Sequence, residues 1–306
     1  MAKQVSSPNA VWFIPHPYRK SLNGVSFSPW NESGLHHRKL MESYTATIVD
    51  KSCIKKCNSH ITFVGEWECC SEHRPNPQYN TNIKDIYQDI HSPFLTTLDS
   101  HTHVLNTDPF VFGDYFYYAC CKKREAMKPG DIVIFGYSQR NFRYKLFVDT
   151  VMVLLGSYLI KNNEDKYFPL AYYNVTLSKI LPHEKVWVGK MYDNTKNIEH
   201  IYNDLEDVYN KMYDENKKMF SFVPCKRVIE DSHNTPIMSS QPVITVQNNN
   251  GNKLLAASNG NHIVVSSPAE MKHIFDDIVS QVQNQGFDLG IYMPMPTYRE
   301  LKDIVK

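Results

Sequence analysis

The chain has 306 residues, about twice the commonest domain size, so we expect two structural units or one elaborated domain. Hydrophobic residues make up 42% and charged residues 21% of the sequence, which excludes wholesale disorder, a collagen-like repeat and a disulfide-stapled miniprotein. The 33 Lys and Arg residues nearly balance the 32 Asp and Glu residues, leaving a formal net charge of +1. No global field therefore draws the protein to nucleic acid or to an anionic membrane, and any such contact must be local.

The lack of a recognisable targeting signal and the cysteine usage lead us to expect a cytoplasmic protein. Residues 1–10 are polar, and the apolar run at 11–14 is too short for the core of a signal peptide. The longest apolar stretch, 146–155, is interrupted by Asp149 and is well short of the roughly 20 residues that span a bilayer. Seven cysteines, an odd count, favour thiols in a reducing compartment. We therefore expect no membrane segment and no disulfide framework.

Short apolar or alternating runs separated by Pro, Gly and Asn fill the first half of the chain: 11–14, 44–49, 61–68, 110–119, 131–137 and 145–155. This spacing is typical of β-structure and predicts a barrel or strongly curved sheet. Pro129 and Gly130 occupy the central positions of a type II turn just before an apolar strand. The run at 146–155 is apolar on both alternating faces, which predicts a central strand.

Helical periodicity enters the second half. Apolar residues recur at spacings of three and four from 198 to 212, which predicts a helix with one buried stripe. Ser267 and Glu270 form a capping box around Pro268, so another helix begins there and ends at Gly286. Short strands are predicted at 170–177, 186–191 and 243–246, and a polar turn or loop at 247–252. The sequence thus predicts an α+β fold, with a β-barrel domain at 1–155 and a smaller mixed α/β unit at 156–306.

Two sets of residues have the spacing of metal ligands. Asp99, His101 and His103 share one face of an extended segment and offer two imidazoles and a carboxylate, which suit zinc or non-haem iron. A polar loop whose histidines bind backbone carbonyls is the alternative. The second set has the outline of a zinc knuckle: Cys53, Cys57, Cys70 and His73. A strand predicted inside this second set favours small buried thiols instead.

Paired carboxylates and one buried charge are further candidates. Glu66 and Glu68 lie on one strand face roughly 7 Å apart, where their repulsion would separate the two pKa values and make an acid and base pair. An exposed polar face is the alternative. Asp149 is a single charge on an otherwise apolar face, which predicts either a buried hydrogen-bond partner or a ligand acceptor in a pocket.

The segment 137–145 is the most nucleic-acid-like part of the sequence. Its aromatic residues alternate with Arg140, Arg143 and Lys145 at the tip of a predicted hairpin. Arginine binds phosphate through two parallel hydrogen bonds, and aromatic faces stack on bases. The alternative is a solvated hairpin.

Residues 106–136 contain, in order, a Pro109-Phe110 turn, an aromatic strand, a Cys121-Lys122 element and a strand that follows Gly130-Asp131 and ends in Gly136. This order resembles the nucleotide-modification-associated domains of prokaryotes and their viruses. The Gly-Asp entry is similar to that of PUA-like barrels, including the ASCH and EVE groups. The resemblance covers about residues 106–150, and the N-terminal segment and the second half have no counterpart. It implies a PUA-like barrel that holds a base or nucleotide, often an unusual one, between aromatic and polar side chains.

We therefore expect a nucleotide or nucleic-acid recognition module of a prokaryotic defence or base-modification system, which needs no cofactor and binds by stacking and base-edge hydrogen bonds. The candidate ligand contacts are Glu66, Asp108, Phe110, Phe112, Tyr137, Arg140, Arg143 and Asp149. The alternative from another class is a metal-dependent hydrolase in which Asp99, His101 and His103 bind zinc or iron. A third is a protein-interaction scaffold. Free nucleotide, DNA and RNA all stay open as ligands.

Overall fold

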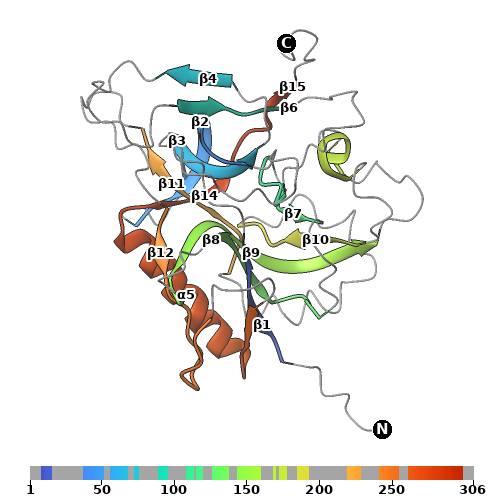
Figure 1. Cartoon of the computed structure of the whole chain (residues 1–306), viewed down its shortest axis with the longest axis vertical. Helices are drawn as coiled ribbons and strands as arrows, with labels where there is room; N and C mark the ends of the chain where they lie inside the picture. Colours follow the sequence, from blue (N-terminus) through green and yellow to red (C-terminus); the bar gives the residue numbers. More distant parts are fainter. Residues whose placement is uncertain are drawn as a thin grey trace.

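The computed structural model of the protein (Figure 1) describes residues 8–15, 37–51, 56–67, 72–75, 89–95, 108–113, 115–119, 126–137, 143–159, 168–169, 172–177, 185–192, 219–228, 241–254 and 261–298. These residues form two large mixed β-sheets, a two-stranded sheet and one long α-helix. The prediction of a strand-rich α+β chain is confirmed. The predicted helix at 198–212 lies outside the described residues.

The first sheet has seven strands. Six follow the order β13-β1-β8-β9-β10-β7, and β12 pairs with β9 beside this path. β1 runs parallel to β8, and β9 is antiparallel to β8, β10 and β12. The central strand predicted from two apolar faces is therefore confirmed. The strand bounds are β1 Ala10–Pro15, β7 Tyr117–Tyr118, β8 Ile132–Tyr137, β9 Leu146–Leu159, β10 Lys185–Gly189, β12 Val243–Ile244 and β13 Asn261–Val264.

The second sheet closes into a small barrel. β14, β11, β3 and β2 are neighbours in that order, and a further pairing of β14 with β2 completes the ring. β5 and β4 extend the sheet beyond β2, while β6 and β15 form the two-stranded sheet. The bounds are β2 His37–Val49, β3 Lys56–Trp67, β4 Glu72–Pro75, β5 Asp89–Ser92, β6 Phe94–Leu95, β11 Val223–Arg227, β14 Asp288–Tyr292 and β15 Thr297–Tyr298.

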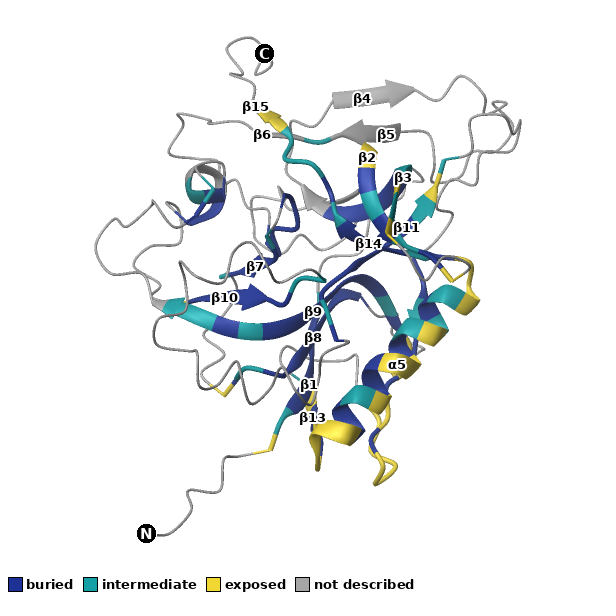
Figure 2. Cartoon of the chain, turned by 180° about the vertical axis from the view of Figure 1, so that it is seen from behind, coloured by how far each residue is buried: buried dark blue, intermediate teal, exposed yellow. Residues whose placement is uncertain are grey.

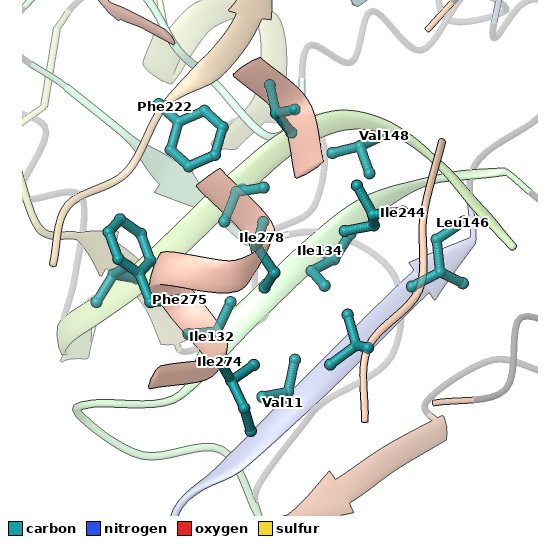
Figure 3. Close-up of a cluster of buried hydrophobic side chains, with 14 of the residues drawn as sticks. Val11, Ile132, Ile134, Leu146, Val148, Phe222, Ile244, Ile274, Phe275 and Ile278 are labelled. Carbon is teal, nitrogen blue, oxygen red and sulfur yellow. The ribbon is translucent and has the colours of Figure 1, made fainter. Parts of the chain in front are cut away.

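The long helix, α5 (Pro268–Asn284), begins where the capping box predicts. Ser267 is the N-cap and its hydroxyl accepts a hydrogen bond from the Glu270 backbone N–H, while Gly286 takes the positive φ of 75° that ends the helix. Its apolar stripe includes Ile274, Phe275 and Ile278, which pack against side chains of β1, β8 and β9 in one buried cluster (Figure 3). The opposite face of α5 is exposed (Figure 2).

One predicted strand is wrong in the part of it that the structure describes. Residues Tyr173–Leu177, inside the strand predicted at 170–177, form a short π-helix. Tyr172 and Leu177 are both fully buried, and their spacing of five residues matches the i to i+5 turn of a π-helix. The Tyr172 hydroxyl also donates to the buried Asp108 carboxylate over 3.0 Å. Tertiary packing has therefore overridden the local β-propensity of this segment.

The predicted division at residue 155 does not follow the strand pairing. Residue 155 lies inside β9, and both large sheets combine strands from before and after it. The closed barrel takes β2 and β3 from the first half and β11 and β14 from the second. In the described part of the chain, no helix is long and apolar enough to cross a membrane.

A fragment of residues 1–155 should therefore lack a cooperative fold. It loses the α5 side chains that cover the first sheet, and each buried aliphatic or aromatic side chain contributes about 1.5–3 kcal/mol against a total stability of about 5–15 kcal/mol. We expect thermal unfolding followed by circular dichroism to show a sharp transition for the full chain and none for the fragment. A sharp transition in the fragment would establish the first half as an independent unit.

Candidate functional site

A buried carboxylate joins β1 to the turn that precedes β8. Asp131 is 1% exposed and accepts four hydrogen bonds: from the Trp12 indole Nε1 (2.8 Å), the Asn9 Nδ2 (2.9 Å), and the backbone N–H groups of Ala10 (3.0 Å) and Lys128 (3.1 Å). The backbone N–H of Asp131 donates to the Lys128 carbonyl across the predicted turn, and Gly130 has the φ of 88° that such a turn requires. Asp131 thus fixes the start of β1 and the orientation of Trp12.

The Trp12 indole in turn supports a histidine. The His262 ring, on β13, stacks on Trp12 with ring centroids 4.2 Å apart and planes 26° apart. Trp12 is 5% exposed, whereas His262 is exposed. Because Trp12 pairs with His262 in the register of β1 and β13, backbone hydrogen bonds position both rings. This edge of the sheet therefore presents the His262 ring, supported from behind by the buried Trp12 ring.

The polar segment 247–252, which follows β12, forms a tight turn beside the His262 ring. The Asn248 side chain accepts from the Asn252 backbone N–H (2.9 Å) and donates to the Val264 carbonyl (2.9 Å). Gly251 adopts a φ of 77°, and its N–H donates to the Asn248 carbonyl. The Asn248 amide is thus used to shape the turn, while Asn250 and Asn252 are exposed at its tip.

Glu270, in the first turn of α5, holds the other side of the loop. Its carboxylate accepts from the backbone N–H groups of Asn249 (2.6 Å) and Ser266 (2.6 Å) and from the Ser266 hydroxyl. The hydrogen bond from the Ser266 hydroxyl is the main cause that lowers the pKa of Glu270 below its ordinary value of 4.5; burial opposes this effect, and the two backbone donors support it. Glu270, in the first turn of α5, therefore also fixes the loop.

Between the loop and β13 lies an open cleft of about 560 Å³. Its lining residues are Pro8, Asn248, Asn250, Asn252, Lys253, His262, Ile263, Val264 and Ser266. Lys253 is the one charged residue among them, and they include no carboxylate. The volume falls within the roughly 300–1,000 Å³ of small-molecule sites. We call this site the Asn-His cleft.

Residues 143–145 of the β8–β9 connection, which we call the hairpin tip, adjoin the Asn-His cleft. Lys253 Nζ lies 5.7 Å from the centroid of the Tyr144 ring, and Arg143 and Lys145 are exposed on either side of Tyr144. The described chain leaves three large hydrophobic side chains exposed: Tyr44, Tyr144 and Val264. Val264 lines the cleft and Tyr144 lies beside Lys253, so an exposed ring and a cation adjoin the cleft on this side.

Three predicted ligand residues lie in the core instead. Phe110 is 0% and Phe112 is 2% exposed, and their rings are 5.6 Å apart in an edge-to-face arrangement. Asp108 is 2% exposed, and its carboxylate accepts from the Ala119 backbone N–H and the Tyr172 hydroxyl. We assign these residues to packing and to satisfied buried polarity rather than to the cleft.

Of the five remaining predicted ligand contacts, two are buried, one is exposed, and two have side chains outside the described residues. Tyr137 is buried and stacks on Phe147, with ring centroids 4.4 Å apart. Asp149 is also buried, as the extra residue of a β-bulge in β9, and its carboxylate accepts a hydrogen bond from the Gln241 amide. Arg143 lies at the exposed hairpin tip. The Glu66 side chain and Arg140 lie outside the described residues.

The predicted metal ligands fall mostly outside the described residues: Asp99, His101, His103, Cys53, Cys70 and the side chain of His73. Cys57 is half-buried on β3. Among the residues that the structure describes, no group of three or more His, Cys, Asp or Glu side chains is close enough to hold a metal ion. The Glu68 partner of the predicted acid and base pair is outside the described residues as well.

Sequence reasoning missed the residues that line the Asn-His cleft. In the sequence, the segment 247–252 indicates only a polar turn. Nothing in the sequence marks His262 as part of a site, because β13 pairs with a strand about 250 residues earlier. No protein-family model matches the sequence, and searches among curated proteins and among solved structures find no significant match.

Replacing Glu270 by glutamine should destabilise the protein in a pH-dependent way. The substitution replaces a charged acceptor by an amide that keeps one neutral acceptor oxygen. Part of the hydrogen bonding therefore survives, and we expect a total loss on the order of 2 kcal/mol near neutral pH. Because the pKa of Glu270 is lower in the folded state, the stabilisation is fully present above the ordinary pKa of 4.5 and is lost as the pH falls through the folded value.

Denaturant unfolding of the parent and the Glu270→Gln variant, from pH 3 to pH 7, tests this expectation. Asp276→Asn is the matched control, since Asp276 is an exposed carboxylate on the same helix that pairs with Lys272; it should change stability by no more than about 1 kcal/mol. A Glu270→Gln effect that is equal at all pH values would contradict the assigned role of the carboxylate.

Proposed function

We propose that the protein is a nucleotide or nucleic-acid recognition module and that the Asn-His cleft receives the base. The observation that carries the proposal is the convergence, in one cleft, of the His262 ring stacked on the buried Trp12, two exposed amides and one lysine. Aromatic surfaces bind the faces of bases, and amides pair with their edges.

Four of the lining residues have a chemical role in this proposal. His262 contacts the face of the base, and the amides of Asn250 and Asn252 donate to and accept from its edge. Lys253, at the hairpin side of the cleft, neutralises the phosphate. Because the amides sit on a turn fixed by Asn248 and Glu270, little ordering is needed on binding.

A second stacked pair elsewhere provides a natural comparison. Tyr44 on β2 stacks on His60 on β3 with the same centroid distance of 4.2 Å and interplanar angle of 26°. There, however, the Glu42 carboxylate accepts from the Tyr44 hydroxyl and lies 3.3 Å from His60 Nε2. A carboxylate at this position repels phosphate, whereas Lys253 attracts it. Electrostatics therefore favour the Asn-His cleft over the Tyr44–His60 pair.

We also propose that β1, β8 and β9 form a PUA-like core that serves a prokaryotic defence or base-modification system, with a modified base as one candidate ligand. The Gly130-Asp131 entry to β8 supports this proposal, because Asp131 organises both β1 and the wall of the cleft.

Binding measurements on the full chain test the proposed function. We expect at least one nucleoside monophosphate to bind in a titration against the four standard bases and their methylated forms. His262→Ala should weaken binding roughly tenfold through lost stacking with an unchanged salt dependence. Lys253→Ala should weaken binding. It should also reduce the slope of log affinity against log salt concentration by about 1, the value for one lost phosphate contact.

Two substitutions serve as matched controls. His60→Ala removes the ring of the comparison pair, and Lys51→Ala removes an exposed lysine that bonds Asn284 rather than the cleft. Both should bind as the parent does. The proposal fails if no nucleotide or oligonucleotide binds, or if the His262 and Lys253 variants bind as well as their controls.

A further inference from the structure

We infer that the ligand is a single-stranded nucleic acid, which places one base in the Asn-His cleft and the adjacent nucleotide over the hairpin tip at Tyr144. This inference rests on the proposed function and specifies its substrate class. It comes from the arrangement of cations and exposed rings across the cleft and the hairpin.

The positive charge of this surface extends beyond the cleft in one direction. Lys253 lines the cleft and its Nζ lies 5.7 Å from the Tyr144 ring, so the lysine connects the cleft to the hairpin. Arg143, exposed and adjacent to Tyr144 in the sequence, adds a second cation on the hairpin side. A single nucleotide held in the cleft supplies a phosphate to Lys253 alone, whereas a longer strand also supplies one to Arg143.

The part of the cleft beside Ser266 is unfavourable for phosphate. Ser266 lines the cleft next to the N-terminus of α5, which is normally a favourable position for an anion. The Glu270 carboxylate already accepts the Ser266 and Asn249 N–H groups, and the Ser267 hydroxyl accepts the Glu270 N–H. A second anion at this point would meet that carboxylate. A phosphate is therefore favoured beside Lys253 rather than beside Ser266.

The exposed ring of Tyr144 gives the next base a place to stack. Tyr144 is 44% exposed between two cations, the pattern of aromatic platforms that bind successive bases of a single strand. In a duplex, each base is already paired and stacked on its neighbours, so neither the cleft nor Tyr144 can contact a base face without unstacking it. Single strands offer both faces at no such cost.

The test compares ligand lengths in the full chain. A nucleoside monophosphate, the matching dinucleotide and tetranucleotide, and a duplex of the same sequence are titrated as DNA and as RNA against the parent, Tyr144→Ala and Tyr144→Phe. Tyr44→Ala is the control, because Tyr44 is similarly exposed, at 51% against 44% for Tyr144, but lies on β2. We expect the dinucleotide to bind the parent about tenfold more tightly than the monophosphate, and the duplex to bind more weakly than the single strand.

Tyr144→Ala should abolish this gain with length, while Tyr144→Phe and Tyr44→Ala should retain the gain. Equal affinity for monophosphate and dinucleotide, equal affinity for duplex and single strand, or a gain that survives in Tyr144→Ala would each overturn the inference while leaving the cleft as a nucleotide site. If the parent binds none of these ligands, the proposed function fails, and the inference fails with it.

Discussion

The carboxylate of Asp131 is the constraint on which the candidate site depends. A buried charge is costly unless it is fully hydrogen-bonded, and four donors from residues 9, 10, 12 and 128 meet this need. The same bonds set the start of β1 beside β8 and orient the Trp12 ring. Since His262 rests on that ring, the geometry of the cleft wall follows from a carboxylate that does not itself line the cleft.

Glu270 holds the loop side of the cleft in place, as Asp131 holds the side formed by Trp12 and His262. It ties the loop at 248–252 and the end of β13 to the first turn of α5, and the buried stripe of α5 packs on the same sheet that carries Trp12. Both walls of the cleft are therefore attached to one core. A surface held in this way loses little conformational freedom when a ligand binds, which is the property a recognition site needs.

Local signals in the sequence predicted the elements that local chemistry determines. The Pro129-Gly130 turn, the capping box at Ser267 and the doubly buried run of β9 all depend on residues within a few positions of one another. The cleft depends instead on pairings such as Trp12 with His262 and Lys253 with Tyr144, which the sequence does not encode locally. For the same reason Phe110 and Phe112 were predicted at a binding surface although they pack in the core: an aromatic pattern does not reveal which face the rest of the chain covers.

Nuclear magnetic resonance titration of the full chain with a single-stranded tetranucleotide tests the central claim most directly, because it locates the ligand without any substitution. The account predicts that the signals of the Trp12 indole N–H, the His262 ring and the backbone amides of 250–253 shift together and saturably, with those of 143–145 following. Signals around Tyr44 and His60 should stay in place. Shifts centred on the Tyr44–His60 pair, or no shifts in the Asn-His cleft at saturating ligand, would contradict the account.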